Sequence, residues 1–222
     1  MKYNYKRITL LSGHYGSGKT NIAVNMAFDL KKNFHNVTIA DLDIVNPYFR
    51  TKDSQTELEQ SGIKLICSEY ANSNVDIPAL PQEMYSVIDD KSQRAVIDIG
   101  GDDRGALALG RYSKGIIEEN DYDMLFVINC YRPLTCDVQT TLEVMREIEN
   151  AGRIKFTGIV NNSNLGEETT ADDILDSLDY ASDISKATRL PIVATCVKEE
   201  LFDVLSERIS NLFALKLQKK II

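Results

Sequence analysis

The chain is constrained most by a glycine-rich segment near its N-terminus, Gly13 to Thr20, which reads GHYGSGKT. The apolar run from Arg7 to Leu11 comes before it and predicts a β-strand, and the residues from Asn21 to Phe28 come after it and predict a helix. The segment fits the pattern G-x-x-x-x-G-K-[ST] in the strand-to-helix context of a phosphate-binding P-loop. The other functional residues of the chain are therefore expected to lie around this loop.

Each residue type in the segment has a task in binding a nucleotide. The three glycines let backbone N–H groups approach phosphate oxygens. Lys19 can reach the β- and γ-phosphates, and the Thr20 hydroxyl can ligate Mg²⁺. We therefore expect the whole segment to contact the nucleotide, that is Gly13, His14, Tyr15, Gly16, Ser17, Gly18, Lys19 and Thr20.

Apolar runs alternate with helical patterns along the rest of the chain. Strands are expected near 37–40, 63–67, 95–99, 124–129, 156–160 and 191–195, and helices near 51–60, 82–89, 106–119, 137–150, 170–186 and 199–219. Continuous apolar strands separated by helices predict an α/β fold, with a mostly parallel sheet of about seven strands flanked by helices. With no linker or internal repeat, a single nucleotide-binding domain over residues 1–222 is expected.

Carboxylates follow two of these strands, at the edge of the sheet where α/β proteins bind ligands. Asp98 ends the run Ala95-Val96-Ile97, which is the Walker B pattern, and it can hold Mg²⁺ through a water. Asp41 and Asp43 follow the second strand; we expect them to point opposite ways, one toward the cation and one toward the attacking water. The alternatives are that Asp43 only caps a turn and that Asp98 is an ordinary strand-end carboxylate.

The amino-acid composition limits the classes of partner that the protein is expected to bind. The chain has 222 residues, 43% of them hydrophobic, and a net charge of −8, which argues against broad binding to nucleic acid or to anionic membranes. Its four cysteines form no C-x-x-C pair and no leader-like segment opens the chain, so we expect a cytoplasmic protein with reduced thiols. The apolar tail from Ile209 to Ile222 is expected to pack on the sheet as part of a last helix rather than to associate stably with a membrane.

The order of these features resembles one group of nucleotide-binding proteins. A P-loop, a strand ending in Asp-x-Asp and a hydrophobic-Asp-x-Gly-Gly-Asp segment are similar to the MinD/ParA/Mrp group of SIMIBI-class P-loop ATPases, to which CobQ/CobB-type and dethiobiotin-synthetase-like enzymes are related. In layout the resemblance extends from about Ile8 to about Val197. It implies ATP or ADP and Mg²⁺ as cofactors, with Thr20, Asp41 and Asp98 near the metal and Lys19, Asp41, Asp43 and Asp98 in catalysis.

The resemblance also implies a base-binding asparagine. Asn162, after the sixth predicted strand, matches the position that contacts the base, and Asn161 is the fallback; an ordinary Asn-rich turn is the alternative. An amide offers both a donor and an acceptor to adenine. Because the guanine-reading motif N-K-x-D is absent, ATP is expected over GTP.

His14 departs from the pattern of the group. It occupies the position of a signature lysine that, in the group, reaches the partner's nucleotide across a homodimer. A histidine is shorter and only partly charged at neutral pH, so the homodimer becomes one possibility, and Arg50 or Arg104 could supply positive charge instead.

Three functions follow from these patterns. The first is a Mg²⁺-dependent ATPase that acts as a nucleotide switch or an assembly factor for an unidentified protein partner. The second is an ATP-dependent small-molecule ligase or kinase, which the missing lysine favours. The third is a regulatory ATP-binding protein with slow or no hydrolysis.

Overall fold

The fold is built on a sheet in which every strand runs parallel to its neighbours. The computed structural model describes residues 3–43, 51–67, 83–101 and 103–217. In that part of the chain eight strands pair in the order β3-β2-β4-β1-β5-β6-β7-β8. They are β1 (Ile8–Ser12), β2 (Val37–Leu42), β3 (Lys64–Ile66), β4 (Arg94–Ile99), β5 (Tyr122–Ile128), β6 (Gly158–Asn161), β7 (Ile192–Lys198) and β8 (Leu212–Leu215).

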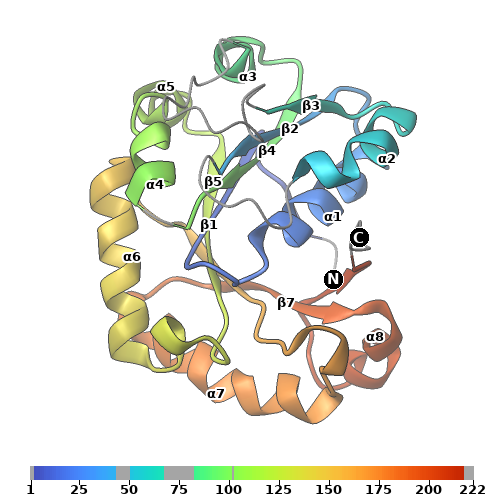
Figure 1. Ribbon diagram of the computed structural model, residues 1–222, viewed down its shortest axis with the longest axis vertical. Helices are drawn as coiled ribbons and strands as arrows, with labels where there is room; N and C mark the ends of the chain where they lie inside the picture. The colour runs from blue at the N-terminus through green and yellow to red at the C-terminus, as the bar shows by residue number, and fades with distance from the viewer. Residues whose placement is uncertain (1–2, 44–50, 68–82, 102, 218–222) are drawn as a thin grey trace.

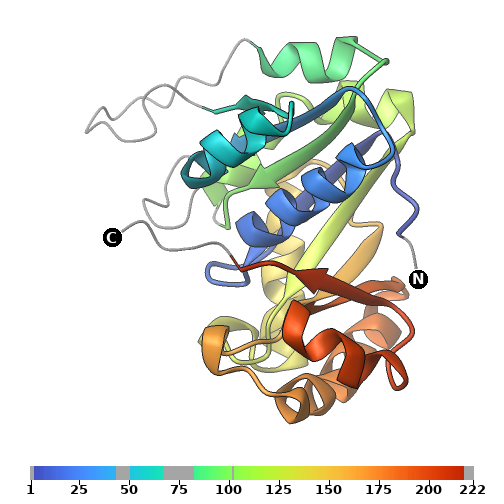
Figure 2. The same cartoon turned by 90° about the vertical axis from the view of Figure 1, so that its right-hand side faces the viewer.

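Helices cover both faces of this sheet (Figure 1). Buried residues of five helices pack on one face: α3 (Met84–Asp89), α4 (Asp103–Leu109), α5 (Ser113–Glu119), α6 (Val138–Gly152) and α7 (Ala171–Thr188). The opposite face is covered by α1 (Lys19–Lys31) and α2 (Gln55–Gln60), and α8 (Glu199–Ser206) packs beside α7 and β8 (Figure 2). The expected α/β fold with helices on both faces is confirmed.

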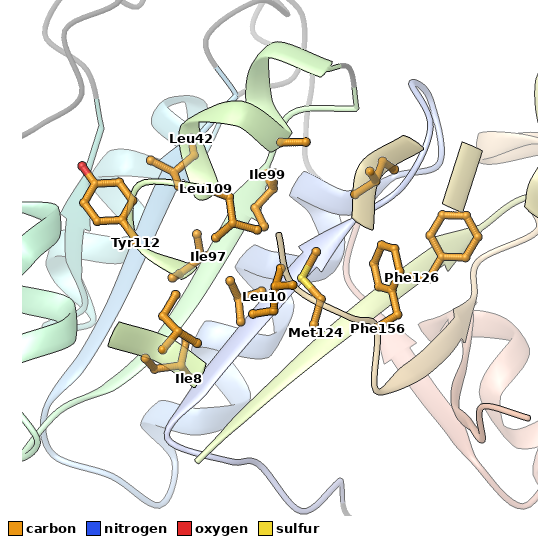
Figure 3. Packing of buried hydrophobic residues seen from close by; sticks show 14 of the residues in the cluster. Ile8, Leu10, Leu42, Ile97, Ile99, Leu109, Tyr112, Met124, Phe126 and Phe156 are labelled. Carbon is orange, nitrogen blue, oxygen red and sulfur yellow. The ribbon is translucent and has the colours of Figure 1, made fainter. Parts of the chain in front are cut away.

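The strands are apolar throughout because both of their faces are buried. Leu10 packs on the α4–α6 side and the next residue, Leu11, packs on the α1 side. Figure 3 shows the first of these layers, in which Leu10 lies between Ile97 and Met124 of the two neighbouring strands. A strand that is buried on both faces shows a continuous apolar run rather than an alternating one, and this is why the strands were predictable from sequence.

The C-terminal segment corrects one expectation. The helix predicted over 199–219 ends at Ser206, and Leu212–Leu215 instead form β8, which adds an eighth strand beside β7. Asn211 holds this strand in place, because its backbone carbonyl accepts from Thr195 N–H and its side chain donates to the Ile192 carbonyl at 2.9 Å. The exposed edge of β7 therefore overrides a local pattern that is compatible with a helix.

A second correction concerns the helix expected over 106–119. The structure divides it into α4 and α5, with a break after Leu109. Gly110 weakens the helix there, and Tyr112 turns inward and is buried in the break. Within the described ranges, no helix is both long and apolar enough to cross a membrane.

Candidate functional site

The glycine-rich segment joins β1 to α1 at the carboxyl edge of the sheet. Gly18, the residue before α1, has φ +85°, a left-handed conformation that glycine adopts without strain. The segment after β4 packs directly against the loop, because a Cβ at Gly101 would lie 2.8 Å from the Gly13 carbonyl oxygen and 2.8 Å from the Tyr15 nitrogen. The loop thus has the form expected of a P-loop, and it lies against Gly101 of the Asp-x-Gly-Gly-Asp segment.

Lys19 is folded back on its own loop. Its side chain is buried, and Nζ donates to the carbonyl oxygens of Gly13 at 2.9 Å and His14 at 3.2 Å. A buried ammonium needs such acceptors. Phosphate oxygens could take their place, since they are stronger acceptors for the same donor.

Thr20 and Asp98 meet where a cation is predicted. The Thr20 hydroxyl donates to Oδ2 of Asp98 at 2.6 Å, and the other carboxylate oxygen, Oδ1, is buried with no hydrogen-bond partner in the described part of the chain. The hydroxyl of Thr51 lies beside Asp98, and its interaction with the carboxylate lowers the pKa of Asp98. The unsatisfied Oδ1 of Asp98 fits a hydrated Mg²⁺, which prefers oxygen ligands and retains several waters.

Burial raises the pKa of Asp98 to about 6, and the nearby Asp43 carboxylate adds to this effect. The charge of Lys19 and the Thr20 hydroxyl act in the opposite direction without cancelling the burial. A divalent cation would favour the ionised form, so the site is electrostatically prepared for one.

Asp41 and Asp43 do not point opposite ways, and that expectation was wrong. Residues two apart on a strand share a face. Asp41 is the register partner of Asp98, and both lie on the α1 side of the sheet, since their strand neighbours pack on the other side. The Asp43 N–H donates to Oδ1 of Asp41 at 2.9 Å, and the Asp43 carboxylate acts on the pKa of Asp98. Asp41 and Asp43 therefore lie on the same side of the sheet as Asp98, although within the described ranges no group of three acidic side chains is close enough to hold a metal ion together.

The two asparagines at the end of β6, Asn161 and Asn162, make different contacts. Asn161 is buried and donates to the Ser177 hydroxyl at 2.9 Å while its Oδ1 accepts from the Ser163 N–H, so it fastens α7 to the sheet. Asn162 instead reaches the P-loop, where Nδ2 donates to the Ser17 carbonyl at 2.6 Å. Of the pair, Asn162 is the residue placed beside the loop, and its contact with a base stays a prediction.

His14 lies in the loop as expected, but with little positive charge. Burial lowers its pKa below the usual value, and Lys19 acts in the same direction, while Nδ1 lies 3.1 Å from the Tyr15 carbonyl oxygen. Burial therefore disfavours the charged form of the imidazole. Arg50, Asp102 and the side chain of Arg104 lie outside the described residues.

Sequence reasoning missed Arg132. This residue follows β5, and its Nε donates to the carbonyl oxygen of Gly16 at 2.9 Å. The rule that polar residues after parallel strands converge on the ligand edge identified Asp41 and Asp98, and applied to β5 it would have identified Arg132 as well.

A P-loop at the start of α1, with carboxylates ending the two nearest strands on one side, defines a P-loop NTPase of the SIMIBI class. The family model for the CobQ/CobB/MinD/ParA nucleotide binding domain matches residues 8–212, and the chain belongs to this family. The resemblance seen in the sequence is thereby confirmed. Comparison with curated proteins gives no match.

Solved structures with a similar fold include three FtsY proteins. The signal recognition particle receptor FtsY from Elizabethkingia anophelis, in complex with GDP, has a TM-score of 0.56 at 15% identity over 99% of this chain and 61% of that one. FtsY from Mycoplasma mycoides has a TM-score of 0.55 at 18% identity, over 87% of this chain and 60% of that one. Cell division protein FtsY from Thermotoga maritima has a TM-score of 0.53 at 15% identity, over 90% of this chain and 64% of that one. The chain thus spans about three fifths of the solved chains, and the likeness is one of fold.

Proposed function

We propose that this protein is a Mg²⁺-dependent ATPase of the MinD/ParA type, acting as a nucleotide switch or an assembly factor. The observation that carries the proposal is the pair of Thr20 and Asp98 at the start of α1, with an unsatisfied buried oxygen beside it. Lys19, the first residue of α1, donates to two loop carbonyls that phosphate oxygens would replace. Together they supply the phosphate-binding and metal-binding parts that phosphoryl transfer needs.

The residues divide the chemistry as follows. Lys19 would bind the β- and γ-phosphates, and Thr20 and Asp98, with Asp41 beside them, would hold Mg²⁺, which supplies charge neutralisation on the phosphates. Asp43 or Asp41 would orient the attacking water. The contact of Gly101 with the Gly13 carbonyl gives the segment after β4 a direct route for sensing the γ-phosphate.

ATP is proposed over GTP on the absence of N-K-x-D and on the placement of Asn162 beside the loop. The FtsY neighbour in complex with GDP shares only the fold at 15% identity, so it does not decide the base. Competition of ATP, GTP and AMP for a fluorescent nucleotide measures the preference. Tighter binding of GTP than of ATP would contradict this part of the proposal.

The second candidate is an ATP-dependent small-molecule ligase or kinase related to the dethiobiotin-synthetase and CobB branch. His14 favours it, because this residue stands at the position of the signature lysine and its burial disfavours the charged imidazole. In this case no ATP-dependent dimer is needed, because each chain supplies all the residues that act on the nucleotide bound to it.

Turnover measurements separate the two candidates. The switch proposal expects phosphate release with Mg²⁺-ATP alone, and slow release that a protein partner accelerates. Release that begins only when a carboxylic or amino compound is added would favour the ligase or kinase. Sedimentation with ATP bound adds a second criterion, because a nucleotide-dependent homodimer supports the MinD/ParA type. We further propose a cytoplasmic location, because the four cysteines form no C-x-x-C pair.

A further inference from the structure

The loop after β5 is held rigidly beside the P-loop. Asn129 is fully buried, and its Oδ1 accepts from the N–H groups of Tyr131 at 3.0 Å and Asn164 at 3.3 Å. Its carbonyl accepts from the Arg132 N–H at 3.2 Å and from the Thr135 hydroxyl at 2.8 Å. The backbone of Arg132 is therefore held by the carbonyl of a buried residue, although the Arg132 side chain is exposed.

The side chain of Arg132 lies against the tip of the P-loop. Nε donates to the Gly16 carbonyl at 2.9 Å, and a Cβ at Gly16 would lie 3.2 Å from Nε, so the absent side chain leaves room for the guanidinium. An arginine carries five N–H donors, of which this bond uses one. In the described part of the chain, no carboxylate forms an ion pair with Arg132.

Arg132 and Asn162 bind successive carbonyls of the same loop, those of Gly16 and Ser17. In a trans peptide the C=O and the N–H point in opposite directions. The bond to the Ser17 carbonyl therefore also fixes the direction of the Gly18 N–H. The bond to the Gly16 carbonyl fixes in the same way the Ser17 N–H, which donates to the His14 carbonyl at 3.2 Å.

The charge at the loop complements this arrangement. Burial lowers the pKa of His14, and the charge of Lys19 acts in the same direction. Lys19 and Arg132 are the fixed positive charges that hydrogen-bond to P-loop carbonyls in the residues described. In a chain of net charge −8, two such cations on one loop form a local site for an anion.

We propose that Arg132 is a phosphate-positioning residue, which holds the P-loop through Gly16 and adds to Lys19 a second fixed positive charge from the same chain. The inference rests on the proposed nucleotide site and adds to it a cation donated by the loop after β5. It replaces a charge supplied across a homodimer with one built into each monomer.

The test compares Arg132→Gln, which removes the charge, with Arg132→Lys, which keeps it, in the full chain. Calorimetry gives the Kd of ATP with Mg²⁺ at several NaCl concentrations, and Arg146→Gln, at an exposed position on α6, is the matched control. We expect Arg132→Gln to weaken ATP about 10- to 100-fold, the range of a hydrogen bond to a charged group. Its Kd should also depend less on salt. Arg132→Lys should keep the salt dependence of the parent with a smaller loss.

Two results would overturn the inference. One is an unchanged Kd in Arg132→Gln, and the other is an equal loss in both variants with the parent's salt dependence, which would leave Arg132 a purely geometric role. Urea midpoints equal to that of the parent show that both variants are folded. If the parent and Arg146→Gln themselves bind no nucleotide, the failure lies with the proposed function and not with Arg132.

Discussion

At the scale of single residues, the site places a carboxylate where its charge is unfavourable. Asp98 is almost completely buried, one of its oxygens has no partner among the described residues, and its pKa is raised to about 6. A carboxyl whose pKa is higher in the folded state stabilises the protein below its unfolded pKa. That contribution is lost as the pH rises through about 6. Without a cation, the ionised carboxylate therefore destabilises the fold near neutral pH.

The substitution Asp98→Asn measures this effect, because the amide keeps the shape and an oxygen for the Thr20 hydroxyl. In EDTA, we expect the variant to match the parent in free energy of unfolding at pH 4 and to exceed it above pH 6. The difference should be on the order of 1–3 kcal/mol. Urea unfolding at both pH values gives the two numbers. A difference that is the same at both would mean that Asp98 does not titrate in this range.

At the scale of elements, helix ends show how local sequence fixes boundaries. Thr170 begins α7 with a capping box: its hydroxyl accepts from the Asp173 N–H, and the Asp173 carboxylate accepts from the Thr170 N–H at 2.7 Å. The same carboxylate accepts from the Thr170 hydroxyl at 2.7 Å. This reciprocal arrangement satisfies two backbone donors that a helix start leaves open.

Removing the cap should destabilise the protein measurably. We expect Thr170→Ala to lower the free energy of unfolding by about 1 kcal/mol, because the Asp173 N–H loses its acceptor. Thr170→Ser keeps the hydroxyl and serves as the control, with a change below about 0.5 kcal/mol. Thermal unfolding of the three proteins tests this, and equal stability of Ala and Ser at the position would show that the cap contributes nothing.

The strands also show which parts of the fold the sequence alone predicts. β1, β4 and β5 were predictable because strands buried on both faces are apolar throughout. β8 was not, because its four residues depend on an edge that β7 offers and on Asn25, whose side chain bonds both the N–H and the carbonyl of Lys216. Such contacts join residues far apart in the chain, and a local pattern does not contain them.

The residues of the candidate site also divide into those that the sequence predicts and those that only the folded chain reveals. The P-loop and Asp98 were found from motifs, because each motif states a backbone conformation and a position at a strand end. The alignment of Asp41 with Asp98, the clamp of Asn162 on Ser17 and the place of Arg132 depend on which strands become neighbours. Strand order is a property of the whole folded chain, and no single segment of the sequence predicts it.

At the scale of the whole molecule, a buried ion pair joins elements at the opposite edge of the sheet from the site. Arg7, at the entry to β1, donates to the Glu119 carboxylate at the end of α5 and to the Val87 carbonyl in α3. Lys91 contacts the same carboxylate at 2.6 Å, but its side chain is 55% exposed, against 4% for Arg7. The same carboxylate thus has one buried and one exposed cation.

Burial should decide what each cation contributes. We expect Arg7→Met to lower the free energy of unfolding by about 3 kcal/mol, because it removes one partner of a buried pair and leaves several carbonyls unsatisfied. Lys91→Met removes the same charge from the surface and should cost less than about 1 kcal/mol. Urea unfolding at pH 7 compares them. Similar losses in the two variants would show that burial does not control the strength of the pair.

Nucleotide binding through the P-loop is the claim on which the rest depends, and calorimetry with Mg²⁺-ATP tests it most directly. The parent chain should bind, and Lys19→Ala should weaken binding by about 100-fold or more, since it removes a buried charge-assisted contact to phosphate. Lys32→Ala, at an exposed position just after α1, should bind as the parent does. If Lys19→Ala binds Mg²⁺-ATP as tightly as the parent, the loop from Gly13 to Thr20 is not the phosphate site and the account is wrong.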